Sequence, residues 1–456
     1  MRIIIIGDGK VGYNLAEQLS GQNNDVVIVD KDPEALGKAI ENLDVMCIKG
    51  SGLSTKILID AGVRHADILI AATNSDEMNM VCCLTAKKIG AQHTIARIRD
   101  PEYADELSQL KADLELDLVI NPEQAVALEI SRLLKFPAAA KVDIFSKGRV
   151  EMVEVKATKD MSIVNIPLRK ISHRLTANVL IGAVYRDGRV LIPKGDFVIK
   201  ENDLIYIVGD PAKVYNFCKN IGIYVHKVKN VMVMGGGRAA YYLAQYLDEM
   251  RIKVKILERD WDRCIKLAEL LPHALIINGD GTDDQTLDAE NLDEMDAFIS
   301  LTGDDEDNLF CAILAKRLGV PKVVAKIYRT NYLDMIGGMG LDNVVSPKHI
   351  TAEYILEYVR GLENAMGNPV KTLYRIIDDK AEAMEFIASG NVTFLDVPLR
   401  YLKMVEGVLI AAIVRRNEII IPHGDDVIKI DDSVILISTA IQINDLNDVL
   451  ESRQDR

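Results

Sequence analysis

The chain has 456 residues, of which 49% are hydrophobic and 27% are charged. This length exceeds what one hydrophobic core usually serves, so we expect roughly two to four globular domains and no long disordered segment. The net charge of −14 argues against nucleic acid and anionic lipid surfaces as general partners, because both require clustered Lys and Arg.

The sequence has no pattern typical of a membrane span or a secretion signal. The longest stretch free of charged residues, Ser433 to Asn444, is well short of the roughly 20 apolar residues that span a bilayer. Met1-Arg2-Ile3 leads straight into a strand-like run, so we expect a cytoplasmic protein. The six cysteines show no C-x-x-C spacing, which predicts buried, reduced thiols. No residues form a convincing metal-ligand cluster, so we assign no metal.

Strand-like and helix-like segments alternate over the first 135 residues. The predicted strands are 2–6, 25–29, 45–48, 67–71, 93–97 and 117–120. The predicted helices are 10–20, 32–42, 53–61, 76–89, 101–110 and 122–135. Strands separated by helices of this length imply right-handed crossovers and a parallel sheet covered on both faces. The commonest fold of this kind is the doubly wound dinucleotide-binding fold.

A glycine-rich turn follows the first strand and opens the first helix, with the sequence Gly7-Asp8-Gly9-Lys10-Val11-Gly12. The first glycine permits the tight turn, the second leaves room for a pyrophosphate, and the third lets helix and strand approach closely. The helix N-terminus then presents unpaired N–H groups and the positive end of its dipole to phosphates. Asp8 places a negative charge beside the phosphate path, so we expect its side chain to point outward, while Lys10 offsets charge there.

The acidic residue that ends the second strand, Asp30, is expected to accept hydrogen bonds from an adenosine ribose diol and to repel a 2′-phosphate. This favours NAD over NADP but does not distinguish NAD from ATP or ADP, which offer the same diol. Thr73 and Asn74 follow the fourth strand, at the edge of the sheet where ligands bind, and are candidate ligands by position. Asp76 is either a ligand or a helix cap, and Arg97 is either a phosphate contact or a member of a surface ion pair.

The same pattern returns in the second half of the chain at an offset of 228 or 229 residues. A strand-like run leads into Gly235-Gly236-Gly237-Arg238-Ala239-Ala240, and Glu258 and Thr302 match Asp30 and Thr73. A fingerprint, a strand and an acid repeated in one register are hard to obtain by chance. Ala240 at the third glycine position and the longer Glu258 make the second site conditional.

Two smaller segments, 140–222 and 370–440, are rich in short β-type runs and repeat at the same offset. Each contains a Pro-x-Gly-Asp turn, followed by a strand (204–208 and 434–438) and a terminal helix. The order of domains is therefore large, small, large, small. The predicted boundaries are 1–137, 140–224, 228–360 and 368–456.

Together these features resemble the TrkA family, the NAD-binding regulatory subunits of Trk-type potassium uptake systems. The likeness rests on the Gly7 to Gly12 loop, on Asp30, on Thr73-x-x-Asp76-Glu77-x-Asn79 and on the Pro-x-Gly-Asp turns. It covers nearly the whole chain as two tandem units of the pattern called RCK or KTN domains. The implied fold class is α/β, with two tandem Rossmann-like doubly wound parallel-sheet domains, each followed by a small α+β domain of the RCK C-terminal type.

The resemblance implies a regulatory subunit without catalysis. NAD or NADH, and ATP or ADP, would bind in the Rossmann clefts of a dimeric or tetrameric ring that gates a separate integral-membrane potassium transporter subunit. The protein would be peripheral on the inner face of the cell membrane. By position, the nucleotide contacts would come from Gly7, Asp8, Gly9, Lys10, Val11, Gly12, Asp30, Thr73, Asn74 and Arg97, and in the second unit from Gly235, Gly236, Gly237, Arg238, Ala239, Glu258 and Thr302.

Two other interpretations of the residues remain open. One is an NAD-dependent dehydrogenase, although the seven histidines are scattered and none lies in a constellation suited to acid–base catalysis. The other is a soluble nucleotide sensor without a membrane partner. Asp8, Ala240 and the non-acidic Ser51 to Ser54 depart from the pattern of the TrkA family, which leaves open whether both sites bind the same ligand.

Overall fold

The computed structural model describes residues 1–22, 24–101, 103, 111, 114–137, 139, 141–171, 179–223, 227–329, 341, 343–363, 370–376, 380–416, 418–439, 443 and 445–451. The chain forms two compact units, Met1–Ser131 with Val228–Leu356, and Arg132–Lys227 with Glu357–Arg456. Most of the helix predicted over 101–110, and the predicted domain ends at 140, 224, 368 and 456, lie outside the described residues. We call residues 1–131 the first large lobe and 228–356 the second large lobe.

The first large lobe contains a six-stranded parallel sheet in the order β3-β2-β1-β4-β5-β6. Its strands are β1 (Arg2–Ile6), β2 (Asp25–Asp30), β3 (Met46–Lys49), β4 (Ile68–Ala71), β5 (His93–Arg97) and β6 (Leu118–Ile120). Its helices are α1 (Lys10–Ser20), α2 (Pro33–Asn42), α3 (Thr55–Asp60), α4 (Asp76–Ile89) and the start of α6 (Pro122–Lys135), with a 3-10 turn at Val63–His65. This is the strand order of the classic dinucleotide-binding fold.

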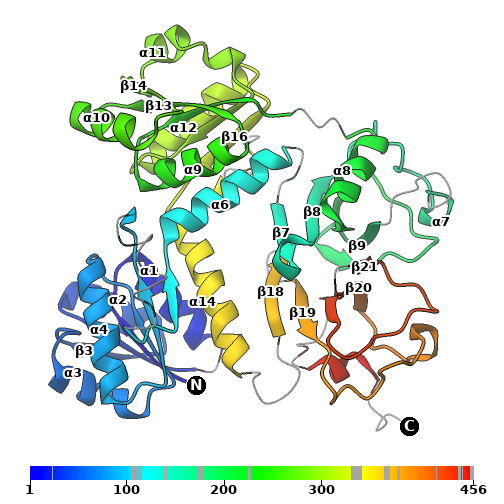
Figure 1. The fold of residues 1–456 in the computed structure, drawn as a ribbon, viewed down its shortest axis with the longest axis horizontal. Helices are drawn as coiled ribbons and strands as arrows, with labels where there is room; N and C mark the ends of the chain where they lie inside the picture. Colours follow the sequence, from blue (N-terminus) through cyan, green and yellow to red (C-terminus); the bar gives the residue numbers. More distant parts are fainter. Residues whose placement is uncertain are drawn as a thin grey trace. The chain divides into compact units, whose positions relative to one another are not determined.

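The second large lobe repeats this order as β14-β13-β12-β15-β16-β17. Its strands are β12 (Asn230–Met234), β13 (Lys253–Glu258), β14 (Leu275–Asn278), β15 (Ala297–Ser300), β16 (Lys322–Lys326) and β17 (Val344–Val345). Its helices are α9 (Arg238–Glu249), α10 (Trp261–Leu270), α11 (Asp284–Ala289), α12 (Asp305–Arg317) and the start of α14 (Pro347–Glu363), with a 3-10 turn at Leu292–Glu294. Helices lie on both faces of each parallel sheet (Figure 1), which confirms the predicted α/β fold class.

The second unit contains two five-stranded antiparallel sheets, in the orders β10-β9-β11-β8-β7 and β18-β19-β22-β20-β21. Their strands are β7 (Lys141–Phe145), β8 (Val150–Lys156), β9 (Val179–Arg186), β10 (Arg189–Leu191), β11 (Leu204–Gly209), β18 (Val370–Ile376), β19 (Ala381–Ile387), β20 (Val408–Arg415), β21 (Glu418–Ile420) and β22 (Ser433–Ser438). The helical segments are α7 (Leu168–Ile171), α8 (Pro211–Asn220) and 3-10 turns at Ser146–Gly148, Leu399–Tyr401 and Leu446–Val449.

The two small sheets share one hydrophobic cluster, to which Phe145 and Tyr206 contribute from the first sheet and Ala383 and Ile437 from the second. Both predicted Pro-x-Gly-Asp turns are present, each closed by a backbone hydrogen bond, such as that from Phe197 N–H to the Lys194 carbonyl at 2.8 Å. The terminal helix predicted after the last strand is α8 in the first copy. In the second copy the described residues form the Leu446–Val449 turn, whose N-terminus is held by a capping box of Asp445 and Asp448.

Burial explains why these runs are strands of a covered sheet. Ile3, Ile4 and Ile5 of β1 are fully buried, as expected when helices cover both faces of a parallel sheet.

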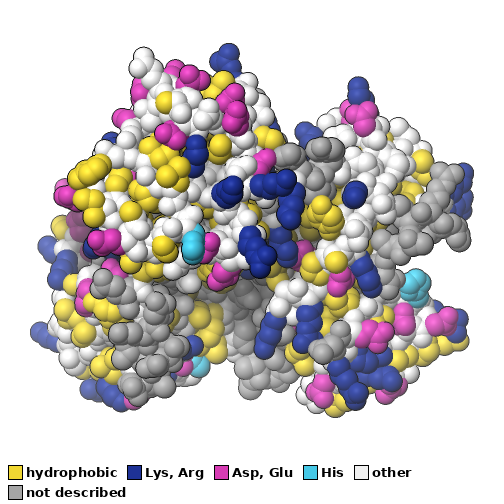
Figure 2. Space-filling view, turned by 45° about the horizontal axis from the view of Figure 1, so that its top comes forward, with side chains coloured by type: hydrophobic (Ala, Val, Ile, Leu, Met, Phe, Trp, Pro, Cys, Tyr) yellow, Lys and Arg dark blue, Asp and Glu magenta, His cyan; other side chains and the backbone are white. Residues whose placement is uncertain are grey.

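Five of the six cysteines are buried and all six are free thiols, as predicted. No helix in the described part of the chain is long and apolar enough to cross a membrane. On the face drawn in Figure 2, basic side chains form small groups among acidic and hydrophobic ones.

Candidate nucleotide-binding site

The loop between β1 and α1 has the geometry that its glycines predict. Gly7 adopts a φ of 101°, and a Cβ there would lie 3.1 Å from the backbone of Thr73. A Cβ on Gly12 would lie 1.8 Å from the Gly7 carbonyl oxygen, so helix and turn pack too closely for a side chain. A Cβ on Gly9 would meet no protein atom within 4 Å. The backbone at Gly7 and Gly12 therefore leaves no room for a side chain, whereas the space beside Gly9 contains no protein atoms.

The first turn of α1 leaves backbone donors available to an anion. Gly9 is the N-cap residue, and no side chain caps this end of the helix. In the second large lobe, Gly237 occupies the same position in α9 and is likewise uncapped by a side chain. Since the first N–H groups of a helix have no partner within it, both loops offer the donors and the dipole that bind phosphates.

The acids that end β2 and β13 occupy equivalent places. One carboxylate oxygen of Asp30 accepts the Asp8 N–H at 2.5 Å, and the other accepts the Asp32 N–H at 2.9 Å. Glu258 accepts the Gly236 N–H at 2.8 Å and the Asp260 N–H at 2.9 Å. Glu258 therefore reaches the loop as Asp30 does, despite its additional methylene. Both acids order the loop and keep lone pairs for a ribose diol.

A cleft of about 330 Å³ lies at the carboxyl edge of the first sheet. Six of the predicted ligands line it: Gly7, Asp8, Gly9, Asp30, Thr73 and Asn74. Lys10, Val11, Gly12 and Arg97, which were also predicted ligands, are not among its lining residues. The lining residues that the sequence analysis did not assign include Ala35, Gly50, Gly52 and Met78. Gly50 and Gly52 carried a signal, because they recur as Gly279 and Gly281.

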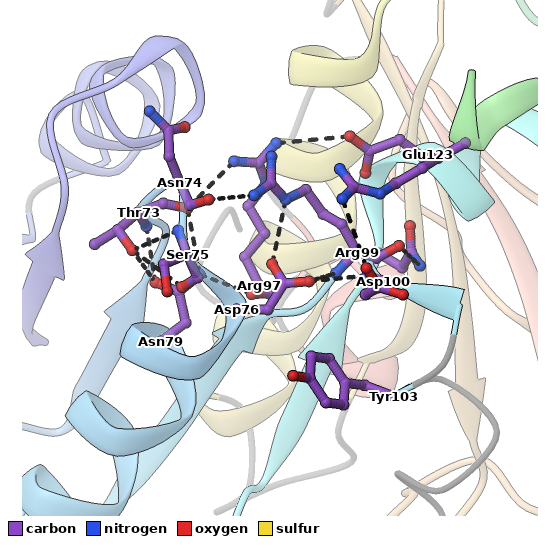
Figure 3. Close-up of polar contacts among 12 residues, drawn as sticks. Thr73, Asn74, Ser75, Asp76, Asn79, Arg97, Arg99, Asp100, Tyr103 and Glu123 are labelled. Carbon is purple, nitrogen blue, oxygen red and sulfur yellow. Dashed lines mark hydrogen bonds and ion pairs between the residues drawn. The ribbon is translucent and has the colours of Figure 1, made fainter. Parts of the chain in front are cut away.

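The Thr73 loop is held in place by Asn79 of α4 (Figure 3). The Asn79 side-chain oxygen accepts the Thr73 N–H at 2.9 Å and the Thr73 hydroxyl at 2.7 Å. The Asn79 amide group donates to the carbonyls of Thr73 and Arg97 at 3.3 and 2.7 Å. Thr302 and Asn308 repeat the arrangement in the second large lobe. The Thr73 hydroxyl is thus engaged within the loop, whereas the exposed Asn74 side chain points away from it.

Asp76 is a structural residue and caps no helix. Ser75 is the N-cap of α4, and its side chain accepts the Met78 N–H. The buried carboxylate of Asp76 instead accepts the backbone N–H groups of Arg99 and Asp100, each at 2.8 Å. It also pairs with the Arg99 side chain at 3.2 Å. Asp76 therefore joins α4 to the segment that follows β5, as Figure 3 shows.

Arg97 lies beside the cleft and faces α6. Its guanidinium donates to the Thr73 carbonyl at 3.4 Å and lies 3.9 Å from the Glu123 carboxylate. Burial lowers the pKa of this guanidinium, and Glu123 counters the effect. The ion-pair partner of Arg97 is therefore the half-buried carboxylate of Glu123. The predicted alternative was an ion pair on the exposed surface.

The Asp8 side chain does not point outward to solvent, contrary to the prediction. The residue is 7% exposed, and neither carboxylate oxygen has a hydrogen-bond partner. Burial, followed by the nearby charges of Asp30 and Asp32, raises the pKa of Asp8 to about 6. The Asp8 backbone is held at the end of β2, because its N–H donates to the Asp30 carboxylate.

The two basic residues at the helix starts contact the opposite large lobe. The Lys10 ammonium lies 4.9 Å from the ring centroid of Tyr328, a cation–π geometry. Arg238 lies 3.7 Å from the Asp100 carboxylate. The Tyr242 hydroxyl of α9 accepts a hydrogen bond from Asn121 at 2.9 Å. Each phosphate loop is therefore followed by a helix that touches the other large lobe.

The candidate ligands of the second large lobe come together around the loop that follows β12. Gly235 has a φ of 96°, and a Cβ there would lie 3.1 Å from the Thr302 nitrogen. The side chains of Ala239 and Ala240 are buried in α9. Arg263 of α10 donates to the Gly236 carbonyl at 2.6 Å, a contact that the sequence did not indicate. Among the described residues, no group of three or more His, Cys, Asp or Glu side chains is placed to hold a metal ion.

Comparison with known protein families places these features in context. The TrkA-N domain model matches residues 3–122 and 231–347, and the TrkA-C domain model matches residues 152–222. A Trk system potassium uptake protein TrkA homolog 1 from Methanosarcina mazei is 37% identical over 448 residues, covering 96% of this chain and 98% of the relative. The Trk system potassium uptake protein TrkA of Vibrio alginolyticus is 34% identical, covering 96% of this chain and 95% of the relative.

Among solved structures, the GsuK channel bound to NAD matches with a TM-score of 0.63 and 20% identity. The match covers 96% of this chain and 77% of the channel chain, and at this identity it supports the fold alone. The names of the two sequence relatives describe potassium uptake and not a dehydrogenase. This confirms the predicted family resemblance and the prediction that the chain is not an enzyme.

Proposed function

We propose that this chain, which belongs to the TrkA family, is a nucleotide-sensing regulatory subunit of a Trk-type potassium transporter. NAD or NADH, with ATP or ADP as competing ligands, binds the first large lobe in the cleft between the Gly7 loop, Asp30 and Thr73. The chain assembles with copies of itself as a dimer or tetramer and acts from the cytoplasmic face on a separate integral-membrane subunit.

The observation that carries the proposal is the combination at the first loop. The N-terminus of α1 is uncapped by a side chain, Gly9 is open to the cleft, and the Asp30 carboxylate lies at the edge of the same cleft. An anion at the helix start and a diol at Asp30 are the two ends of an adenosine phosphate. The GsuK channel, which shares this fold, has been solved bound to NAD, and we propose the same class of ligand for this chain.

Regulation requires that the nucleotide bind two conformations with different affinity. The contacts between the large lobes offer a route, because Lys10 opens the helix that would receive the phosphates and also contacts Tyr328 of the second large lobe. A phosphate near Lys10 competes with the aromatic ring for the ammonium charge. We therefore expect nucleotide binding to weaken or shift the contact between Lys10 and Tyr328. This would change how the two large lobes are arranged.

Calorimetric titration of the full chain with NAD tests the ligand. Loss of a charged hydrogen-bond acceptor costs roughly 1.5–3 kcal/mol, so Asp30→Ala should weaken binding by about tenfold or more. Asp44→Ala, which removes an exposed acid from the turn between α2 and β3, is the matched control and should bind as the wild type does. Unchanged affinity in a folded Asp30→Ala protein, verified by circular dichroism, would refute the site assignment.

The membrane partner is tested separately. Affinity capture from detergent-solubilised membranes should recover a multi-spanning transport protein. Recovery of no such protein, together with retained NAD binding, would favour a sensor without a membrane partner. Turnover of NAD with a 2-hydroxy acid or an alcohol by the purified chain would instead favour a dehydrogenase.

A further inference from the structure

The two phosphate loops differ in the side chains packed behind them. In the second large lobe, a Cβ on Gly236 would lie 2.5 Å from a methyl group of Leu267, so that leucine fills the space. In the first large lobe the residue at the position of Gly236 is Asp8, and the residue at the position of Leu267 is the fully buried Ala39. The first loop thus has a buried carboxyl group where the second has a glycine, and the first large lobe has the smaller Ala39 where the second has Leu267.

Among the described residues no side chain pairs with the Asp8 carboxylate, although Lys31 lines the same cleft. The two oxygens of this carboxylate have no hydrogen-bond partner. The charged groups that act on it are Asp30 at the end of β2 and Asp32 at the start of α2, and both raise its pKa. Burial, followed by the nearby charge of Asp8, raises the pKa of the Cys47 thiol on β3. An unpaired negative charge therefore lies under the loop where phosphates would bind.

The second loop has the same two acids, Glu258 and Asp260, but it has no counterpart of the Asp8 carboxylate and has an additional guanidinium. Arg263 places its Nε 2.6 Å from the Gly236 carbonyl, and it is only partly buried. The residue at its position in the first large lobe is Ala35, which lines the cleft. The first loop thus has the carboxylate of Asp8, which the second loop lacks. The second loop has the guanidinium of Arg263 at the position where the first has the methyl group of Ala35.

We infer that the two nucleotide sites select ligands by phosphate charge in opposite directions. The first site favours nucleotides of low phosphate charge, such as a dinucleotide pyrophosphate, over adenosine di- and triphosphates, and the second site favours the more highly charged ones. Asp8 and Arg263 are the specificity-determining residues. This inference rests on the proposed nucleotide-binding function and deepens it, because the competing nucleotides then divide between the sites.

Coulomb's law gives the direction of both effects. Each added phosphate charge raises the repulsion from an ionised Asp8 and the attraction to Arg263, and low dielectric around buried groups strengthens both. Protonation of Asp8 removes the repulsion, so the first site should lose its selectivity as the pH falls. The titratable groups coupled to Asp8 are Asp30, Asp32 and Cys47. Lys31 is the cation that lines the same cleft, and its charge does not change over this pH range.

The series AMP, ADP and ATP tests the inference, because its members share adenosine and differ in phosphate charge. Calorimetric titrations use the full chain at pH 8, with Glu258→Ala to isolate the first site and Asp30→Ala to isolate the second. At the first site, affinity relative to AMP should fall along the series. Asp8→Asn should raise the affinity for ATP on the order of tenfold and that for AMP much less. At the second site, Arg263→Ala should lower the affinity for ATP more than that for AMP.

A second variant guards against a folding defect. Asp8→Gly combined with Ala39→Leu reproduces the packing of the second large lobe, and it should remove the selectivity of the first site as Asp8→Asn does. Lowering the pH to 5.5 should reduce the selectivity of the wild-type first site more than that of Asp8→Asn, which controls for protonation of the ligand itself. A selectivity among AMP, ADP and ATP that is the same in the wild type and in both Asp8 variants would overturn the inference. Absence of any nucleotide binding would instead refute the proposed function.

Discussion

The buried carboxyl group of Asp8 should make the first large lobe less stable as the pH rises. Its folded-state pKa is about 6, against 3.8 for an unperturbed Asp. The native state therefore binds the proton more tightly than the unfolded chain does, so the free energy of unfolding falls as the pH rises between these two values. At 1.36 kcal/mol per pKa unit, ionised Asp8 costs about 3 kcal/mol at pH 8 and about half of that at pH 5.

The Asp8→Gly, Ala39→Leu double variant removes this ionisation and fills the space with the leucine that the second large lobe uses. Its stability advantage over the wild type should grow by about 1.5 kcal/mol between pH 5 and pH 8. Urea unfolding followed by circular dichroism measures the difference, and hydrogen exchange of the β1 peptide assigns the transition to the first large lobe. Asp44→Asn, which alters an exposed acid, serves as the control and should show no such growth. An advantage that does not depend on pH would refute an unpaired, ionisable Asp8.

Three further predictions concern the loop and its supports. Asn79→Ala removes four hydrogen bonds between the Thr73 loop, α4 and β5, and it should lower the free energy of unfolding by roughly 2–4 kcal/mol. The control Asn74→Ala should change the free energy of unfolding little. Equal urea midpoints for the two variants would contradict the role of Asn79. Gly12→Ala places a Cβ 1.8 Å from the Gly7 oxygen and should cost about 1–3 kcal/mol in the same assay, while a neutral result would mean that the loop adjusts freely. Tyr328→Leu removes the ring that Lys10 contacts, and it should change the NAD affinity of the first site by roughly threefold through the freed ammonium; an unchanged dissociation constant would rule out that coupling.

The sheet architecture was predictable because its signals are local and repeated. Strand-like runs separated by amphipathic helices specified the six strands of the first large lobe to within one residue at each end. Gly7, Gly9 and Gly12 specified the turn, since only that spacing satisfies its steric requirements. Asp30 was predictable for the same reason, because it ends a strand next to that turn.

The orientation of individual side chains was not predictable, because it depends on residues distant in the sequence. Asp8 is buried, and the spacing of the glycines around it gives no indication of which residues of α2 and α10 pack near the two loops. The roles of Asp76 and Asn79 depend on backbone groups at the end of β5 and just after it, about twenty residues away. Sequence spacing alone does not identify such partners, so the alternatives for Asp76 were a ligand and a helix cap, and its link to the segment after β5 was not predicted.

The contacts between the large lobes were not indicated by the sequence. Lys10 and Arg238 looked like charge compensation at the helix starts, and both instead contact the opposite lobe. Internal repetition predicts that two lobes share a fold but says nothing about which surfaces meet. That information matters most for a regulatory protein, because it decides how an occupied cleft reaches the rest of the chain.

The most direct test of nucleotide sensing is potassium flux in proteoliposomes that contain the membrane subunit and this chain. With the wild-type chain, adding NAD should change the flux. With Asp30→Ala, which removes the ribose acceptor of the first cleft, the flux should no longer respond at the same nucleotide concentration. A response of equal size with both proteins would contradict the account, because the first cleft would not be where the nucleotide acts.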